Sequence, residues 1–234
     1  MLRVSQNLPE QVHRLRECIA AAAARSGRNA TSITLLAVAK AQPAERVRAA
    51  AAQGVRDIGE SYLDEALEKL AALEDLPLTW HFIGRLQANK TRPVAERFAW
   101  VHAVDRMRIA QRLSAQRPFH APALNVCIQV NLAAEATKAG VRPADLPALA
   151  AQVAALPRLK LRGLMCIPPE ESEPARQRHW FAKLRRLLEQ LNAGGADLDT
   201  LSMGMSADFE SAILEGATVV RIGTALFGPR PASG

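Results

Sequence analysis

The stretch Ile33-Thr34-Leu35-Leu36-Ala37-Val38-Ala39-Lys40 decides the fold and raises the first functional question. Its apolar run predicts a mostly buried strand, and the run is closed by a lysine. An amine at the end of such a strand can be partly desolvated, which favours the neutral, nucleophilic form and suits imine formation with an aldehyde. Lys40 is therefore a candidate for a Schiff base. The alternative is a strand that ends in an ordinary solvated lysine.

Seven more β-rich segments follow, separated by helix-like stretches rich in Ala, Leu and Arg. The eight predicted strands are Ile33–Lys40, Val55–Ser61, Thr79–Gly84, Trp100–Asp105, Leu124–Asn131, Leu159–Ile167, Leu201–Ser206 and Val219–Gly223. The predicted helices include an opening helix over roughly Gln6–Ala24, within an N-terminal segment 1–30, and then Pro43–Gln53, Leu63–Leu73, Met107–Gln116, Pro143–Ala155, Pro174–Asn192 and Asp208–Glu215. Eight alternating strand and helix units point to an α/β protein with a single (β/α)8 TIM barrel. A doubly wound open sheet is the runner-up.

Composition agrees with one barrel domain over residues 1–234. The chain has 234 residues and 49% hydrophobic content, enough for a full core, and no linker divides it. The start, Met1 to Asn7, lacks the apolar core of a secretory signal, and no apolar stretch is long enough to span a bilayer. We therefore expect a soluble, cytoplasmic protein that does not bind a membrane.

Charge and cysteine content exclude other classes. The net charge of +7 comes from arginines spread along helices, and aromatic residues make up only 4%, so nucleic-acid binding is not expected. Cys18, Cys127 and Cys166 are odd in number and lack metal-site spacing. We expect them to be reduced and packed, with no metal or redox role.

In a barrel, functional groups gather where strands end, and an anion commonly binds near the loops after strands seven and eight. Ser202, Gly204 and Ser206 lie at the seventh predicted end, and Gly223 and Thr224 at the eighth. Glycines admit backbone amides to an anion, and the hydroxyls and a helix start near Ala207 add donors. These residues predict a phosphate site. The alternative is that Ser206 only caps a helix and Gly223 only ends a strand.

Two further side chains could contact a cofactor. Arg221 lies two residues before Gly223 and so shares its face of the strand. Because arginine keeps its proton, a pyridine nitrogen beside it would stay an unprotonated acceptor, and the ring would be a weaker electron sink. The alternative is a structural ion pair with Asp57 or Glu60. His81 could touch the cofactor, or it could be a packed strand histidine.

Several motifs resemble one family. The longest is Trp80-His81-Phe82-Ile83-Gly84-Arg85-Leu86-Gln87-Ala88-Asn89-Lys90, which is similar to the signature of the pyridoxal phosphate homeostasis proteins (YggS/PROSC type). Similar pieces run from the first strand to the last: Ala37-Val38-Ala39-Lys40, Gly163-Leu164-Met165, Ile167-Pro168, Leu201-Ser202-Met203-Gly204-Met205-Ser206 with Asp208, and Val220-Arg221-Ile222-Gly223-Thr224 with Phe227-Gly228. The resemblance therefore covers nearly the whole chain.

The resemblance implies a barrel of the alanine racemase N-terminal-domain type (PLP fold type III), with pyridoxal 5′-phosphate (PLP) as cofactor. It implies Lys40 as the Schiff-base lysine and Arg221 near the pyridine nitrogen, with Ser202, Gly223 and Thr224 around the phosphate. One departure is Ser61, which stands where the family usually has asparagine. Lys138 matches a family lysine, and we expect at most an anion contact from it.

The resemblance leaves enzyme and carrier open. Racemases of this fold type add a C-terminal β domain whose tyrosine serves as a second acid or base. This chain stops at Gly234, and its one tyrosine, Tyr62, lies beside the second strand. Because racemisation needs two positioned groups, we expect a non-catalytic protein that holds PLP on Lys40 and yields it to PLP-dependent apoenzymes. The alternatives are a weak amino-acid racemase or lyase, and an interaction protein with a vestigial site. We expect a monomer or a weak homodimer.

Overall fold

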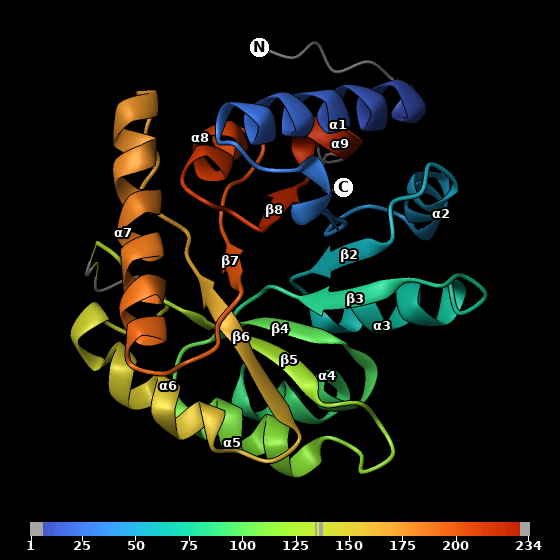
Figure 1. Ribbon diagram of the computed structural model, residues 1–234. Coiled ribbons are helices and arrows are strands. Elements are labelled where there is room, and N and C mark those ends of the chain that lie inside the picture. Colours follow the sequence, from blue (N-terminus) through green and yellow to red (C-terminus); the bar gives the residue numbers. More distant parts are fainter. Residues whose placement is uncertain (1–6, 134, 136–137, 230–234) are drawn as a thin grey trace.

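The first strand, β1 (Thr34–Val38), pairs in parallel with the last, β8 (Val219–Ile222), so the sheet closes on itself. The protein is described by a computed structural model that covers residues 7–133, 135 and 138–229. The strands between are β2 (Asp57–Glu60), β3 (Thr79–Phe82), β4 (Trp100–Val104), β5 (Leu124–Gln129), β6 (Leu159–Met165) and β7 (Thr200–Ser202), each parallel to its neighbours (Figure 1). This closed barrel confirms the predicted fold and rules out an open doubly wound sheet.

Helices surround the barrel and bury its outer face. They are α1 (Leu8–Arg25), α2 (Ala44–Ala52), α3 (Leu63–Ala72), α4 (Thr91–Arg97), α5 (Met107–Gln116), α6 (Leu146–Ala154), α7 (Pro174–Ala193), α8 (Phe209–Leu214) and α9 (Thr224–Phe227). Short 3-10 turns occur at Ala30–Ser32, Ala88–Lys90 and Pro143–Asp145. The apolar side chains of helices and strands form one large cluster between the two layers.

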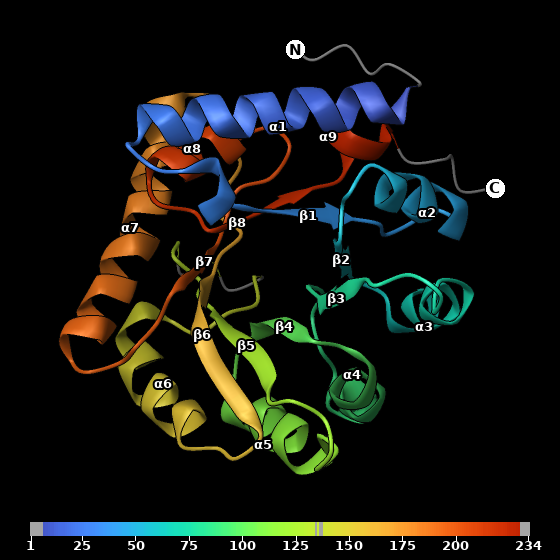
Figure 2. The same ribbon diagram turned by 45° about the vertical axis from the view of Figure 1, so that its right-hand side comes forward.

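The opening helix covers the seam where the barrel closes. In Figure 2, α1 runs across α8 and α9, and it contacts both helices. Leu15 on α1 is almost completely buried in the core. Shortly after this helix, Arg28 Nη1 donates a hydrogen bond to the Ala217 carbonyl just before β8 (2.8 Å). The N-terminal segment is thus tied to the last strand.

The predicted elements differ from the structure in several places, of which three have a clear physical reason. The strand predicted over Leu201–Ser206 ends at Ser202, because Gly204 has φ +91°, which breaks an extended strand. The helix predicted over Pro143–Ala155 begins as a 3-10 turn and becomes α-helical only at Leu146. The helix α4 was not predicted, because seven residues with Pro93 in the first turn give little periodicity. Gln6, the predicted helix start, lies outside the described residues.

The structure also bears on the cysteines, on metal binding and on membrane-spanning helices. Cys127 and Cys166 are free and fully buried, and burial raises the pKa of each thiol to about 12. Cys18 is also free but only partly buried. Over residues 7–133, 135 and 138–229, no cluster of His, Cys, Asp and Glu is suited to hold a metal ion. Within the same residues, no helix is long and apolar enough to cross a membrane.

Candidate functional site

Lys40 follows the end of β1, and the peptide groups on both sides of it are held by side chains from α3. Lys69 Nζ donates to the Ala39 carbonyl (2.6 Å), and Glu65 Oε1 accepts from the Ala41 amide (2.6 Å). Ala41 has φ +58°, an unfavourable conformation for alanine that bends the chain sharply after the strand. The backbone that carries Lys40 is thus fixed on both sides.

Lys69 also contacts a buried carboxyl group, that of Glu60 on β2. Lys69 Nζ contacts Glu60 Oε1 at 2.7 Å and Glu65 Oε1 at 2.5 Å, and the Glu60 side chain is completely buried. Burial raises the pKa of Glu60 from its ordinary value of 4.5 to about 7, although the hydrogen bond from Lys69 opposes the rise. The second oxygen of Glu60 has no hydrogen-bond partner among the described residues. Glu60 therefore keeps its proton to an unusually high pH.

A cavity of about 370 Å³ opens at the end of the barrel where the strands finish, and Lys40 is part of its wall. We call it the barrel-mouth cavity. Its polar side chains are Lys40, Gln42, Ser61, Glu170, Ser206, Arg221 and Thr224. Apolar side chains such as Val38, Ile83, Ile167 and Met205 complete the wall. An apolar pocket with a few convergent polar groups is the usual form of a small-ligand site.

Five of the seven predicted site residues line this cavity: Lys40, Arg221, Ser206, Gly223 and Thr224. The other two, Ser202 and His81, are not among its lining residues. Both are buried inside the barrel, where they belong to a hydrogen-bond chain that reaches Arg221. Lys138 is not in the cavity wall; its amine pairs with Glu135 at 2.9 Å. Ala136 and Thr137 of that loop lie outside the described residues.

Arg221 is buried on β8 and is held by oxygen atoms of neighbouring strands. Its Nη1 donates to the Ser202 carbonyl (2.6 Å) and hydroxyl (2.9 Å), and its Nη2 donates to the Cys166 carbonyl (2.8 Å). Burial lowers the pKa of the guanidinium, but arginine starts so high that it stays charged. The predicted alternative, an ion pair with Asp57 or Glu60, does not form: those carboxylates pair with His81 and Lys69.

The predicted phosphate cradle is built from two loops. Ser206, in the turn after β7, accepts a hydrogen bond at its hydroxyl from the Ala225 amide in the first turn of α9 (3.2 Å). Ser206 thus caps a helix, but the helix is α9 rather than the one that follows it in sequence. Gly223 precedes α9, and a Cβ there would meet only Val38 at 3.5 Å. Protein packing does not require this glycine, which leaves close approach of a ligand as a reason for it.

Gly204 and Asp208 have structural roles beside the cavity. Gly204 has positive φ, and a Cβ there would lie 2.6 Å from Ala212, so it lets α8 pack against the end of β7. Asp208 Oδ1 accepts from the Met205 amide (2.6 Å). Burial raises the pKa of Asp208, while that hydrogen bond and the charge of Arg221 oppose the rise. Its carboxylate therefore organises the turn that carries Ser206.

Two polar lining residues were not predicted. Gln42 is buried, and its Oε1 has no hydrogen-bond partner among the described residues, so the wall holds an unused acceptor. Glu170 adds a carboxylate from the loop after β6. The strand-end rule could have found Gln42, which lies two residues after Lys40. Glu170 lies farther from its strand, and sequence gave no signal for it.

A larger groove of about 710 Å³ lies elsewhere, between α6, β6 and the end of α7. Its wall is mostly apolar, with Lys160, Gln190 and Asp197 as polar members. None of the predicted site residues is in it. The smaller barrel-mouth cavity, where amine, guanidinium and hydroxyls meet, is therefore the candidate site.

Comparison with known proteins agrees with the fold and identifies the family. Residues 11–231 match the family model described as alanine racemase, N-terminal domain. The chain is 59% identical over 230 residues to the pyridoxal phosphate homeostasis protein of Pseudomonas aeruginosa, covering 98% of this chain and 97% of that protein.

Solved structures give the same result. PipY of Synechococcus elongatus, in a structure with PLP bound, matches with a TM-score of 0.84 and 39% identity over 95% of this chain and 100% of that chain. Alanine racemase from Corynebacterium glutamicum matches at 18% identity with a TM-score of 0.71, over 97% of this chain and 63% of that one. This last similarity concerns the fold alone.

Proposed function

Because the chain belongs to the family of pyridoxal phosphate homeostasis proteins, whose barrel is the alanine racemase N-terminal domain, we propose that it binds PLP in the barrel-mouth cavity and takes part in the homeostasis of that cofactor. The observation that carries this proposal is the meeting of Lys40, Arg221, Ser206 and Thr224 around one cavity of about 370 Å³. These groups offer an amine for an aldehyde and several donors for a phosphate and a ring.

The donor set fits the cofactor. The hydroxyls of Ser206 and Thr224, beside Gly223 and the start of α9, suit the phosphate. Arg221 faces the cavity as a fixed donor, which suits the lone pair of a pyridine nitrogen and would leave that nitrogen unprotonated. In this proposal Ser202 and His81 act through Arg221 rather than by touching the cofactor.

Lys40 holds the cofactor covalently in this proposal. Its Nζ attacks the aldehyde carbon, a C=N bond forms, and the carbonyl oxygen leaves as water. Water or another amine can cleave this C=N bond and regenerate the lysine amine, so PLP can be taken up and released without being consumed. Reversible storage of a reactive aldehyde, with delivery to PLP-dependent apoenzymes, is the role that this arrangement supports best.

Glu170 supports a second candidate function, that of an enzyme. A carboxylate and an amine in one cavity wall could move a proton at two positions, which is the minimum for a racemase or lyase acting on amino acids. The test is turnover of an amino-acid panel by wild type and by Glu170→Gln. Turnover that is lost in this variant supports the enzyme; no turnover supports the carrier.

The primary test is direct. Purified protein is incubated with PLP, its absorbance spectrum is recorded, and the protein is reduced with borohydride and digested for mass spectrometry. We expect the pyridoxyl mass on Lys40, and its loss in Lys40→Arg. Lys138→Arg, outside the cavity, is the matched control and should load normally. A colourless, unmodified wild type would overturn the proposal.

Delivery is tested separately. Loaded protein is mixed with a PLP-dependent apoenzyme, and recovered enzyme activity is followed against the same concentration of free PLP. We expect reactivation by loaded wild type and none by protein whose Lys40 adduct has been fixed with borohydride. Failure of wild type to reactivate would limit the role to storage.

A further inference from the structure

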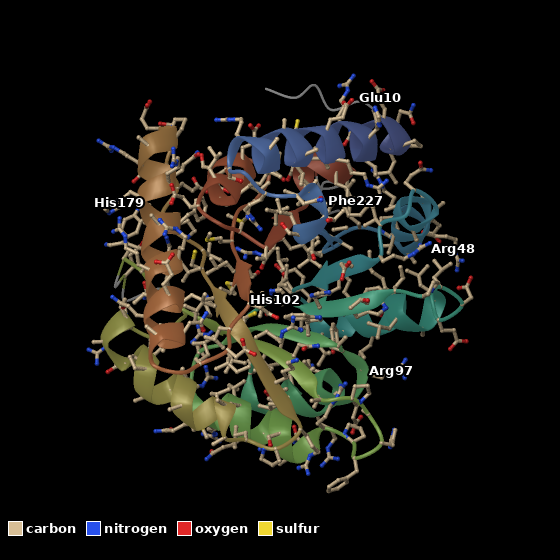
Figure 3. The ribbon with its side chains drawn as sticks, viewed as in Figure 1. Glu10, Arg48, Arg97, His102, His179 and Phe227 are labelled. Carbon is tan, nitrogen blue, oxygen red and sulfur yellow. The ribbon has the colours of Figure 1, made fainter. Side chains whose placement is uncertain are left out.

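A single chain of hydrogen bonds crosses the barrel interior and ends at Arg221. Asp57 Oδ1 lies 3.0 Å from His81 Nε2, and His81 Nδ1 lies 2.9 Å from His102 Nε2. His102 Nδ1 lies 2.8 Å from Ser202 Oγ, which is 2.9 Å from Arg221 Nη1. The five residues come from β2, β3, β4, β7 and β8. His102 lies in the middle of the barrel in Figure 3, and β4 and β7 are not neighbours, so the contact passes through the interior.

The chain joins the two mouths of the barrel. Asp57 is the first residue of β2, and its side chain is 32% exposed, whereas those of His81, His102 and Ser202 are buried. All strands are parallel, so Asp57 lies at the mouth opposite to Lys40. Arg221 is part of the cavity wall. The chain thus connects a solvent-facing carboxylate with the candidate cofactor site.

The groups at the two ends of this hydrogen-bond chain fix the direction in which every hydrogen bond is donated. Arg221 can only donate, and the Asp57 carboxylate can only accept. Burial lowers the pKa of His81, although Asp57 opposes this, and it lowers the pKa of His102 strongly, so both rings are neutral. A neutral ring donates once and accepts once. Hence His81 carries its proton on Nε2, His102 also on Nε2, and the Ser202 hydroxyl donates to His102 Nδ1.

We propose that Asp57, His81, His102 and Ser202 are positioning residues that hold Arg221 in place for the cofactor ring, with Asp57 acting from the opposite mouth of the barrel. This inference rests on the proposed function. No carboxylate pairs with Arg221 within the described residues, so its partners are the Cys166 and Ser202 carbonyls and the Ser202 hydroxyl. The aligned chain keeps a lone pair of that hydroxyl turned toward Arg221, because the hydroxyl proton is committed to His102.

Breaking the hydrogen-bond chain should weaken the positioning of Arg221. In Asp57→Asn the end group can donate as well as accept, so the reversed proton order becomes available. The Ser202 hydroxyl then accepts from His102, and its own proton is free to turn toward Arg221. We expect the dissociation constant for PLP to rise roughly three- to tenfold. Asp199→Asn is the matched control. Asp199 lies at the same mouth of the barrel as Asp57, but it pairs with Arg162 and is not part of the hydrogen-bond chain.

The proton order is measured in long-range ¹H–¹⁵N spectra of the histidine rings in the cofactor-free protein. We expect both His81 and His102 to be protonated on Nε2 in wild type and in Asp199→Asn, and to show mixed tautomers in Asp57→Asn. Addition of PLP should shift the His102 ring signals in wild type, although His102 is not in the cavity wall. Protonation of either ring on Nδ1 in wild type would overturn the proposal.

A double-mutant cycle tests the coupling. Ser202→Ala cuts the chain next to Arg221, so adding Asp57→Asn to it should not weaken PLP binding further. Additive losses would show that Asp57 acts by another route and would overturn the inference, as would unchanged PLP affinity in Asp57→Asn. A wild type that takes up no PLP would refute the proposed function instead, and the ring tautomers would still report the chain by themselves.

Discussion

Arg221 shows how a buried cation is held when no carboxylate among the described residues forms an ion pair with it. Its planar group reaches two backbone carbonyls and one hydroxyl at once: the carbonyl of Cys166, directly after β6, and the carbonyl and hydroxyl of Ser202 on β7. A lysine has one nitrogen at the end of a flexible stem and cannot span these acceptors. The residue type is therefore set by geometry as well as by charge.

We predict that Arg221→Lys lowers the free energy of unfolding by about 1–3 kcal/mol, because buried acceptors lose their donors. Urea denaturation measures the change. Arg97→Lys, at the exposed position labelled in Figure 3, is the control and should stay within about 0.5 kcal/mol of wild type. Equal stability of the two variants would contradict the role assigned to Arg221.

Glu60 gives a pH prediction. In the folded protein it keeps its proton up to about pH 7, whereas in the unfolded chain it ionises above about pH 4.5. The unfolded state therefore binds fewer protons in this window, and this group makes the free energy of unfolding fall as pH rises. Glu60→Gln cannot ionise. Its free energy of unfolding should rise relative to wild type by about 3 kcal/mol between pH 4.5 and 7.

The measurement is a series of urea titrations at several pH values. Glu68→Gln, exposed on the following helix α3, is the control and should show no such trend relative to wild type. A difference between wild type and Glu60→Gln that does not vary with pH would mean that Glu60 is ionised throughout.

Within the candidate site, sequence patterns predicted best which residues near strand ends line the barrel-mouth cavity. Lys40 and Arg221 could be placed because a strand end fixes where a side chain emerges. The contacts of Ser202 and His81 could not be predicted, since their partners lie on strands distant in sequence. Pairing across a barrel interior depends on strand register, which residue patterns do not specify.

Strand register also explains why residue 163, in β6, is a glycine. A Cβ at this position would lie 1.8 Å from the Thr200 carbonyl oxygen, so β6 and β7 can approach only because residue 163 is glycine. We predict that Gly163→Ala lowers the free energy of unfolding by about 3 kcal/mol or more, and that it weakens PLP binding by moving Ser202.

Gly194→Ala is the matched control for that change. An added Cβ there would be 3.3 Å from the Leu191 carbonyl oxygen, a tight contact that a small shift relieves, so we expect a loss below about 1 kcal/mol. Thermal unfolding and PLP titration of both variants make the comparison. A stable Gly163→Ala protein with normal PLP affinity would contradict the close approach of β6 and β7.

Elements were predicted well where a pattern was long and poorly where backbone geometry decided the boundary. The helix Met107–Gln116 was placed to the residue because its apolar face is clear. The end of β7 was placed too late because Gly204 adopts positive φ, and α4 was missed because it is short. Local strain and single turns leave little trace in apolar periodicity.

For the whole molecule, closure of the sheet predicts one cooperative unit. The strands β1 and β8 pair, and α1 packs on α8 and α9, so neither end of the described chain can detach without opening the seam. We predict that far-UV circular dichroism and tryptophan fluorescence report the same thermal transition. The fluorescence comes from Trp80, Trp100 and Trp180, on β3, β4 and α7.

A variant in the opening helix sharpens that test. Leu15→Ala should lower the free energy of unfolding by about 2–5 kcal/mol and should shift both signals together. Glu17→Ala, exposed on the same helix, is the control. Two separated transitions, or loss of helix signal before the fluorescence change, would show that α1 and the barrel unfold as different units.

The overall architecture was predictable because eight alternating units allow few arrangements, and parallel strands bring all their ends to one mouth. For the candidate site, only the gathering of its residues at one mouth of the barrel was predictable. Which residues touch, and which support them from inside the barrel, depends on how the sheet closes.

That closure has a consequence for how the protein is made. Lys40 follows the first strand and Arg221 lies on the last, so the cavity straddles the seam that their pairing creates. On the ribosome, Lys40 emerges while most of the chain is still to be synthesised, and at that stage it is one amine among many. A nascent or truncated chain that ends before β8 lacks Arg221, Gly223 and Thr224, and so lacks one side of the cavity wall. On the proposed function, the capacity to capture the cofactor would therefore arise only once the final strand has docked.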